Sequence, residues 1–354
     1  MNDTRIKWID ILKGIGIILV VVGHANWLFT NATPSTFIQK YIYSFHMPLF
    51  FFLSGYLFIN KKYSNYKKIL ILKFKTLLIP YFFFSIIPVL YNIMVTLKYN
   101  GNLFNYQTII IQVLYLKKTI VVWDEPLWFL VCLFVVEILY YSISGYKWNT
   151  KIIILLFCAY GGYRLSSVAN FYVLPWSIGI ALTSIIFYAM GNYFRHSKIG
   201  HKITLPNRLI FCIFFTINLI IGGFQNIYVS MYYLVYGNLF YFYLASFSGI
   251  IAYIQISQFI KKNNFLTSIF EYYGRNSIII LCTHYFVLKF LQNMHITDSL
   301  FLNYTPLKGY LNALITLLLS IPSIFIINRF FPCIFGRKKM SINIANKMLV
   351  IPHE

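Results

Sequence analysis

Apolar segments of about 20 residues recur along the whole chain, and they are the feature that most constrains its fold. A helix needs about 20 apolar residues to cross roughly 30 Å of hydrocarbon. Hydrophobic residues make up 59% of the sequence and charged residues only 11%, which is too little polar surface to cover a water-soluble globule. The segments lie at residues 9–29, 42–59, 77–97, 127–145, 152–168, 176–194, 208–224, 232–259, 276–293 and 309–331. The sequence therefore predicts an all-α, polytopic membrane helix bundle of about ten transmembrane helices.

The basic residues test how these helices thread through the bilayer. If the N-terminus is cytoplasmic, 23 of the 30 Lys and Arg residues fall on the cytoplasmic side, and every cytoplasmic segment carries at least two of them. Basic residues are retained on that side during insertion, so we expect both termini to be cytoplasmic. The net charge of +22 is spread over short loops and does not form one patch. It therefore favours the lipid bilayer and an anionic cosubstrate as partners, and not nucleic acid.

The domain organisation is expected to be simple. We expect one membrane domain over residues 1–335 and a short basic cytoplasmic tail over residues 336–354, because the stretches between the apolar segments are too short for a soluble domain. The five cysteines stand singly in apolar stretches without a CxxC motif. We therefore expect neither a disulfide nor a metal site.

Ionisable side chains in the first apolar segment share one helical face. Such groups are unfavourable in hydrocarbon, so each is a candidate functional residue. Asp10, Lys13 and His24 are separated by three and eleven residues, which places them on one narrow stripe at about 100° per residue. Lys13 lies near the cytoplasmic end, and His24 lies about 16 Å further along the helix axis. This stripe could hold an anionic carrier at Lys13 and place its reactive end beside the imidazole. Alternatively, Lys13 reaches lipid phosphate and His24 is a hydrogen-bonded core residue.

Histidine is the residue type best suited to take a proton from a hydroxyl near neutral pH. Its unperturbed pKa is about 6.5, so a neutral imidazole is an effective general base. Glu137 lies near the centre of the fourth segment, where a carboxyl group must be protonated or paired. Its candidate roles are catalytic, by orienting His24 or the acceptor, or structural, by a hydrogen bond between helices.

Further candidates lie at the ends of the apolar segments. His46 and Trp128 are expected near the outer surface. His46 could contact the acceptor sugar or be a surface residue, and Trp128 could stack on a sugar or anchor the helix at the interface. Asp124 and Glu125 are candidates for substrate binding, although acidic residues before Pro126 also suit the start of a helix.

The ninth segment carries candidates for a cofactor and for a substrate. Arg275, Asn276 and Ser277 open this segment from the inside, and the N-H groups at a helix N-terminus suit a phosphate. Asn276 or Ser277 as a simple N-cap explains the same residues. His284 lies within the segment and is either a substrate-binding residue or a structural one.

Four sequence motifs, in this order, resemble a known family. Lys13, ten further residues and His24 resemble the first helix of the acyltransferase family 3 membrane proteins, which show Arg or Lys, ten residues and His. The aromatic-rich run at residues 45–56, with its Ser-Gly pair, resembles the next signature. The runs Pro-Leu-Trp-Phe-Leu at 126–130 and Gly-Arg-Asn-Ser at 274–277, followed by His284, resemble in particular the branch that includes fucose 4-O-acetylases.

The resemblance implies a function for the chain. It implies a multi-pass O-acyltransferase of the bacterial cytoplasmic membrane. The enzyme would move an acyl group, by this resemblance acetyl, from cytoplasmic acetyl-CoA to a hydroxyl of a cell-surface or lipid-linked polysaccharide sugar, without a metal. It also implies that His24 is the catalytic histidine, as a general base or a transient acyl carrier, and that Lys13 is its basic partner. Many members have Arg at the position of Lys13, so this chain offers phosphate a point charge where they offer a bidentate clamp.

Three questions stay open at the level of sequence. Many members carry a C-terminal extracytoplasmic esterase-like domain, and we see none here, so either the chain acylates its acceptor directly or a separate extracytoplasmic partner completes the transfer. A flippase or transporter of lipid-linked sugars would share the same hydropathy, but would not consume acyl-CoA. A polymerase of surface polysaccharide would be expected to present a sizeable outer loop, and none is evident.

Overall fold

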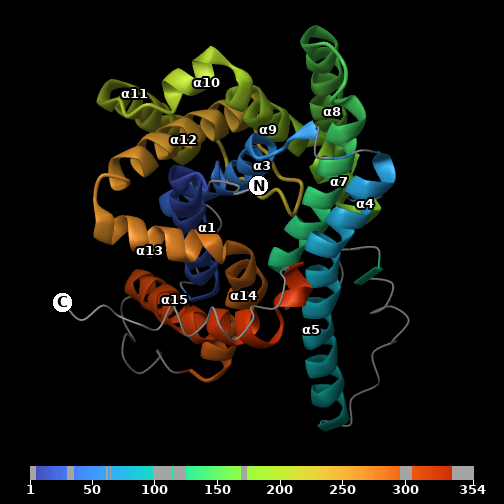
Figure 1. The fold of residues 1–354 in the computed structure, drawn as a ribbon. Coiled ribbons are helices and arrows are strands. Elements are labelled where there is room, and N and C mark those ends of the chain that lie inside the picture. The colour runs from blue at the N-terminus through green and yellow to red at the C-terminus, as the bar shows by residue number, and fades with distance from the viewer. Residues whose placement is uncertain are drawn as a thin grey trace, which may run out of the picture.

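The computed structural model describes residues 5–29, 36–60, 63, 65–98, 113–114, 125–168, 174–295 and 305–336. Within these ranges the chain is helical and contains no β-strand, apart from one isolated bridge between Ser230 and Val235 (Figure 1). The all-α prediction is confirmed for these residues. The main helices are α1 (Lys7–Phe29), α2 (Phe37–Tyr43), α3 (His46–Tyr56), α4 (Tyr66–Lys73), α5 (Ile79–Lys98), α7 (Trp128–Ile143), α8 (Trp148–Val168), α9 (Ile178–His196), α10 (Lys198–Ile203), α11 (Arg208–Asn218), α12 (Leu239–Ile260), α13 (Asn264–Arg275), α14 (Ser277–Asn293) and α15 (Thr305–Phe330).

Short helical turns extend or connect several of these helices. A π-helical turn joins α4 to α5, and a second one continues α11. Tight 3₁₀ turns precede α7 and α9 and follow α15. These turns are Phe74–Leu78 and Leu219–Gln225 for the π-helical pair, and Glu125–Leu127, Pro175–Ser177 and Pro332–Phe335 for the 3₁₀ turns.

Six helical segments of the described chain are long and apolar enough to cross a membrane. They are Lys7–Phe29, Tyr66–Ile87, Pro175–His196, Arg208–Gln225, Leu239–Ile260 and Leu307–Phe330. Large apolar side chains also lie on the outside of the bundle, and Leu156 and Phe157 of α8 are 59% and 73% exposed. Such a surface is unfavourable in water and expected against lipid. The chain is therefore a multi-pass membrane protein, and the count of ten spans and the sides of the termini stay predictions.

Helix α1 occupies the centre of the bundle. It packs against α13, α15, α14, α12, α2 and α3, and most of its residues are buried (Figure 1). The crossing with α13 is close, because a Cβ atom on Gly274 would collide with the main chain at Asp10 and Gly14. The three residues of the stripe proposed from the sequence, Asp10, Lys13 and His24, stay partly exposed in this central helix.

The second apolar segment, predicted as one span over residues 42–59, is divided into two short helices. The backbone leaves the helical conformation at Phe45, and α3 is only 11 residues long. The physical reason is Pro48, which lacks an N-H to bond the Ser44 carbonyl and would crowd it in a continuous helix. In the first turn of α3 the proline is tolerated. The freed Ser44 carbonyl accepts a hydrogen bond from Ser246 of α12 at 2.6 Å.

The eighth apolar segment, predicted over residues 232–259, begins as a helix only at Leu239. Gly237 adopts a positive φ of 64°, which a helix cannot accommodate. Asn238 then caps α12, because its side chain accepts hydrogen bonds from the N-H groups of Phe240 and Tyr241. The residues before Gly237 consequently form a turn outside the helix.

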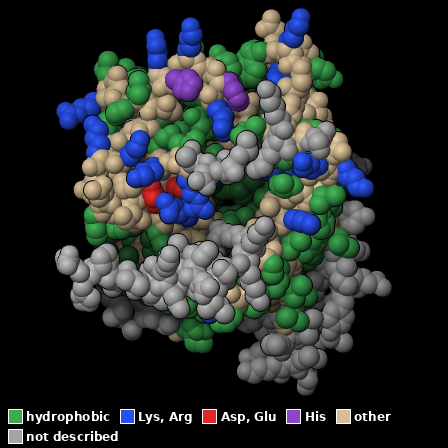
Figure 2. Space-filling view, viewed as in Figure 1, with side chains coloured by type: hydrophobic (Ala, Val, Ile, Leu, Met, Phe, Trp, Pro, Cys, Tyr) green, Lys and Arg blue, Asp and Glu red, His purple; other side chains and the backbone are tan. Residues whose placement is uncertain are grey.

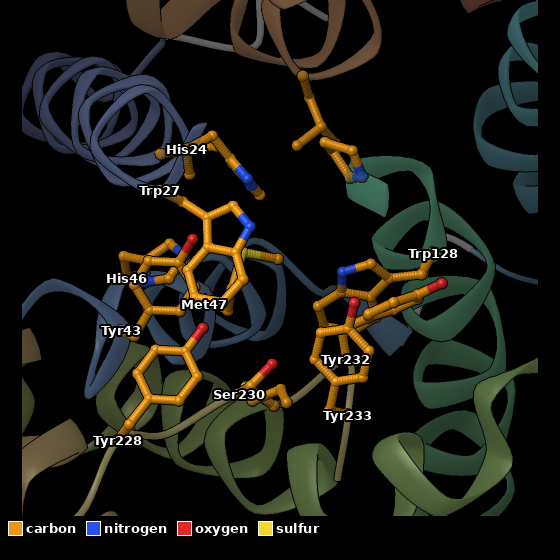
Figure 3. Close-up of a pocket in the computed structure, with 14 residues that line it drawn as sticks. His24, Trp27, Tyr43, His46, Met47, Trp128, Tyr228, Ser230, Tyr232 and Tyr233 are labelled. Atoms are coloured by element: carbon orange, nitrogen blue, oxygen red, sulfur yellow. The ribbon is translucent and has the colours of Figure 1, made fainter. Parts of the chain in front are cut away.

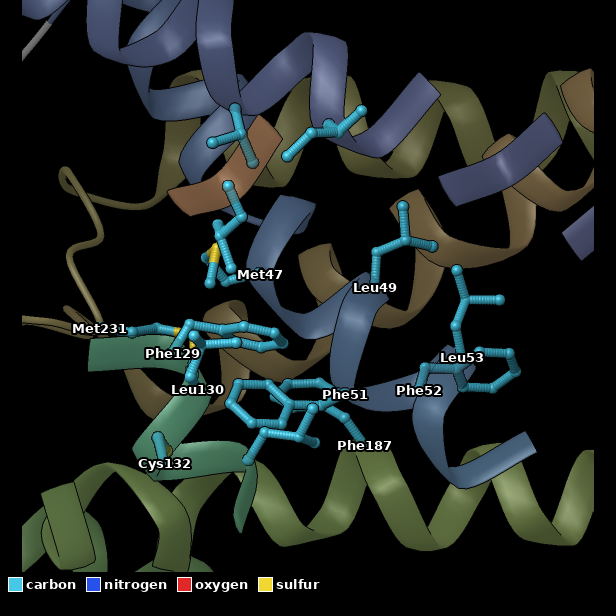
Figure 4. Close-up of a cluster of buried hydrophobic side chains, with 14 of the residues drawn as sticks. Met47, Leu49, Phe51, Phe52, Leu53, Phe129, Leu130, Cys132, Phe187 and Met231 are labelled. Atoms are coloured by element: carbon cyan, nitrogen blue, oxygen red, sulfur yellow. The ribbon is translucent and has the colours of Figure 1, made fainter. Parts of the chain in front are cut away.

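The apolar core is centred on α3. Its Leu49, Phe51, Phe52 and Leu53 meet side chains of α7, α9 and the turn before α12 (Figure 4). The contact with α9 is very close, because a Cβ atom on Gly55 would collide with the main chain of Tyr188. Because α3 is short and deeply buried, its N-terminal end and the residues just before it are held in a fixed position.

Candidate active site

A pocket lies near the C-terminal end of α1, and His24 forms part of its wall. It has about 630 Å³ of empty space, including its open side. Figure 3 shows His24, Tyr43 and Tyr228 on one side of the pocket, and Trp128, Tyr232 and Tyr233 on the opposite side. The lining residues are Val20, His24, Trp27, Tyr43, His46, Met47, Pro126, Trp128, Tyr228, Ser230, Met231, Tyr232, Tyr233 and Leu281. The histidine is therefore accessible from a cavity.

Five separate parts of the fold bring this pocket together. His24 lies in the last two turns of α1, and Tyr43, His46 and Met47 flank the break between α2 and α3. Trp128 is the first residue of α7, and the turn before α12 and the middle of α14 close the remaining sides. The break at Pro48 has a direct effect here, because it places Tyr43, His46 and Met47 at helix ends that line the cavity.

Three histidines from three helices gather at this place. His46 and His284 are buried, and each Nδ1 donates a hydrogen bond to the carbonyl four residues earlier, at 2.8 Å. His24 is half-buried, and its ring centroid lies 5.3 Å from that of His284. Its Nδ1 is buried and has no hydrogen-bond partner in the described chain. His24 thus reaches the pocket through the other edge of its ring.

Aromatic side chains form most of the remaining wall. The rings of Trp27 and Tyr228 are nearly parallel, with centroids 6.2 Å apart, and Tyr43 lies 5.4 Å from Tyr228. On the opposite side, Trp128 lies 6.4 Å from Tyr232. Flat aromatic faces with polar edges suit a ligand that presents both C-H groups and hydroxyls.

The turn at residues 226–238 carries the tyrosine-rich wall, and one side chain holds it in shape. The buried Asn226 donates from Nδ2 to the Tyr236 carbonyl at 3.1 Å. Its Oδ1 accepts from the N-H groups of Ile227 and Asn238, at 3.0 and 3.1 Å. Gly237 packs directly on this carboxamide, so a Cβ atom there would collide with Oδ1. The wall is thus built on a rigid frame.

Lys13 lies at the opposite end of α1 from the pocket. Asp10 provides its nearest opposite charge, and Lys13 forms no hydrogen bond or ion pair with the described residues. Arg275 at the end of α13 lies 3.5 Å from Asp10 and 2.6 Å from Glu271. Figure 2 shows a small acidic patch among Lys and Arg side chains on the face at the start of α1, beside a hollow.

Glu137 lies on another side of the molecule and does not line the pocket. Lys73 of α4 donates to its Oε1 at 2.8 Å and lies equally close to Oε2. The carboxylate is thus paired, as the sequence requires of a buried acid. Burial raises the pKa of the neighbouring Tyr63 phenol above its ordinary value. A catalytic role for Glu137 stays a prediction.

Asn276 and Ser277 open α14, as predicted, but Asn276 does not cap it through its side chain. Its Nδ2 donates to the Tyr272 carbonyl at 2.9 Å, and its Oδ1 accepts from Asn328 at 3.1 Å. The residue therefore links α13 to α15, and binding of coenzyme A at Arg275, Asn276 and Ser277 stays a prediction.

The pocket unites some of the residues singled out from the sequence and not others. His24, His46 and Trp128 line it, and His284 lies behind His24. Glu125 begins the 3₁₀ turn before α7, and Asp124 lies outside the described residues. The described chain contains no group of three or more His, Cys, Asp or Glu residues arranged to hold a metal ion.

The sequence reasoning missed most of the aromatic wall. Trp27, Tyr43, Ser230 and the tyrosines at 228, 232 and 233 all line the pocket. Trp27 follows His24 by three residues and so shares its helical face, which is a usable signal. The tyrosines gave no comparable signal, because Tyr and Phe are frequent throughout this chain.

Comparisons with known proteins add one finding. A family model described as an acyltransferase domain matches residues 6–329 of the chain. Neither the curated proteins nor the solved structures include a match. The matched range begins just before α1 and ends within α15, so it includes every element of the pocket.

Proposed function

The chain belongs to acyltransferase family 3, and on that premise we propose that this membrane acyltransferase moves an acetyl group from cytoplasmic acetyl-CoA to a sugar hydroxyl. The acceptor is a cell-surface or lipid-linked polysaccharide, and the enzyme resides in the bacterial cytoplasmic membrane. The observation that carries the proposal is the exposed ring edge of His24, in a pocket walled by aromatic side chains.

The pocket suits the acceptor better than the donor. Saccharide rings stack their C-H faces on aromatic rings and use hydroxyls to bond polar edges, and Trp27, Trp128 and Tyr228 offer such surfaces. A nucleotide diphosphate would need cationic partners. None of the lining residues is Lys or Arg, whereas Lys13 and Arg275 lie at the other end of α1.

The donor then approaches from the end of α1 that carries Lys13. Lys13 and His24 are separated by eleven residues, or about 16 Å along the helix. Val20, one turn before His24, and Leu281 of α14 are apolar residues that also line the pocket. In this arrangement the phosphates of coenzyme A remain near Lys13, and the acetyl thioester extends past Val20 to His24.

The reaction needs one group that first accepts and then returns a proton. The accessible nitrogen of His24, Nε2, takes the proton from the sugar hydroxyl as the oxygen attacks the thioester carbonyl. The C-S bond breaks as the C-O bond of the ester is formed, and the coenzyme A thiolate receives the proton from the imidazolium. In the alternative route the same nitrogen is transiently acetylated. This route also requires that Nε2 of His24 is accessible from the pocket.

Replacement of His24 tests the proposal. In reconstituted protein supplied with labelled acetyl-CoA and glycan from cells that lack the gene, His24→Ala is expected to reduce acetyl transfer by at least about 100-fold. The exposed His196 of α9 offers a matched control, and His196→Ala is expected to keep normal activity.

Two results would contradict the proposal. Wild-type transfer by correctly folded His24→Ala protein would remove this residue from the chemistry. Glycan-stimulated transport without any consumption of acetyl-CoA would replace the transferase with a sugar transporter. Mass analysis of the glycan identifies the acylated hydroxyl and the acyl group.

A further inference from the structure

His46 and His284 are fixed by their own helices, while His24 is not. Each of the first two uses Nδ1 to bond the backbone carbonyl four residues earlier. His24 also lies in a continuous helix, yet its Nδ1 is buried without a hydrogen-bond partner among the described residues. The ring that borders the pocket is therefore the one whose orientation its own helix does not set.

The backbone bond of His284 determines which of its nitrogens carries the hydrogen. A carbonyl oxygen can only accept, so Nδ1 of His284 must donate to Ile280. In the neutral ring, Nε2 then holds a lone pair and can only accept. This Nε2 is also buried and has no partner in the described part of the chain.

The two unpaired nitrogens belong to neighbouring rings. The centroids of His24 and His284 are 5.3 Å apart and the ring planes are inclined by 50°. At this centroid separation, a nitrogen of one ring that points toward a nitrogen of the other lies at a hydrogen-bond distance of about 3 Å. A buried donor or acceptor without a partner is unfavourable, so a bond between these two nitrogens removes both penalties at once.

We propose that His284 is a positioning residue that accepts a hydrogen bond from Nδ1-H of His24. This bond holds His24 in the tautomer whose Nε2 lone pair faces the pocket. The inference rests on the proposed function of His24 and adds the residue that orients it. The packing agrees, because Tyr285 and Tyr43 meet His24 edge to face, with centroids 5.5 and 6.3 Å away, and limit rotation of the ring without fixing its tautomer.

The bond serves both halves of the reaction. As Nε2 of His24 takes the hydroxyl proton, the ring becomes an imidazolium whose Nδ1-H still points to His284. The proton then leaves from Nε2 to the departing thiolate, and the starting tautomer is restored. His284 neither gains nor loses a proton, so it acts on the reaction only through His24.

The test compares two substitutions of His284, one of which keeps a hydrogen-bond acceptor and one of which does not. His284→Gln offers an amide oxygen near the position of Nε2, whereas His284→Phe fills the space without an acceptor. We expect kcat to fall roughly 100-fold in the Phe variant, with KM for both substrates unchanged, because misorientation of a reacting group has effects of this size. We expect the Gln variant to recover most of the lost kcat.

A neighbouring residue provides the control for changes to α14. The Oγ1 of Thr283 bonds the Ile279 carbonyl at 2.9 Å, the same kind of bond to its own helix. Thr283→Val is expected to leave both kcat and KM unchanged. A merely structural role for His284 would lower the folded yield or the thermal stability of both variants together and would not separate Gln from Phe.

The outcomes separate this inference from the proposed function. Wild-type kcat in His284→Phe, together with loss of transfer in His24→Ala, would overturn the positioning role and leave the acyltransferase assignment intact. Equal loss in the Gln and Phe variants would also overturn it. Full activity of His24→Ala would instead remove the premise on which His284 was assigned.

Discussion

Two buried polar clusters in this bundle differ in how fully they are paired. Lys73 and Glu137 meet at 2.8 Å between α4 and α7, and each charge compensates the other. At the pocket, His24 and His284 each keep one buried nitrogen without a hydrogen bond in the described chain. This pair joins α4 to α7, and each of its two charges has its opposite within contact distance. Polar atoms left unpaired beside a cavity are the ones available to a substrate or to each other.

The largest expected effect is a loss of stability when one member of the Lys73–Glu137 pair is removed. Lys73→Met would leave the Glu137 carboxylate buried without its partner, and removal of one member of a buried pair costs about 3–5 kcal/mol. Denaturation of the purified protein in detergent measures this loss. Because Lys73 does not line the pocket, kcat of the folded fraction should stay at the wild-type value.

The double variant Lys73→Met with Glu137→Gln sharpens the same prediction. Removing both charges avoids the unpaired carboxylate, so the double variant should be more stable than Lys73→Met alone. If this stable double variant bound both substrates but had lost turnover, Glu137 would have a direct part in the chemistry, and the contrast between the two clusters would not hold.

An intermediate effect is expected at the N-terminal end of α1. Lys13→Met should raise KM for acetyl-CoA about 10-fold, equivalent to about 1.4 kcal/mol, because the donor phosphates lose a cation. KM for the acceptor should not change. Lys13→Arg should keep tight donor binding, and Lys7→Met, at the exposed start of the same helix, serves as the control. Steady-state kinetics with each substrate varied in turn measures both KM values. A change in acceptor KM would contradict this prediction.

The smallest effect is expected at the aromatic wall. Tyr228→Leu keeps an apolar side chain but removes a flat ring that lies against Trp27 and Tyr43, which is worth on the order of 1 kcal/mol. Acceptor KM should therefore rise about 5-fold without a change in donor KM. Tyr146→Leu, at a tyrosine that is 55% exposed and outside the pocket, should have no effect. A change confined to donor KM would place the donor in this pocket.

Local patterns in the sequence predicted the parts of the molecule that depend on local physics. Each predicted apolar segment contains a helix, because hydropathy and length determine where a helix can face lipid. His24 stood out because an imidazole deep in an apolar helix is unusual. Glu137 was expected to be paired, but Lys73 lies 64 residues earlier, and nothing in either segment indicated the match.

The remaining features of the site depend on contacts between distant segments. The pocket unites α1, α3, α7, α14 and the turn before α12, and no periodicity of one segment reveals its neighbours. The break before α3 had a local signal in Pro48, which we interpreted as part of a single span. The contact between the rings of His24 and His284 depends on the packing of α1 on α14 and could not be predicted from either helix alone.

Asn226 holds the main-chain conformation of the turn independently of the side chains that the turn carries. Its three hydrogen bonds all go to main-chain atoms, so the residues between Asn226 and Gly237 can be exchanged while the loop conformation is kept. If the proposed acceptor site is correct, substitutions in this one short loop would change which sugar is accepted. Such an exchange leaves His24 on α1 and His284 on α14 unchanged.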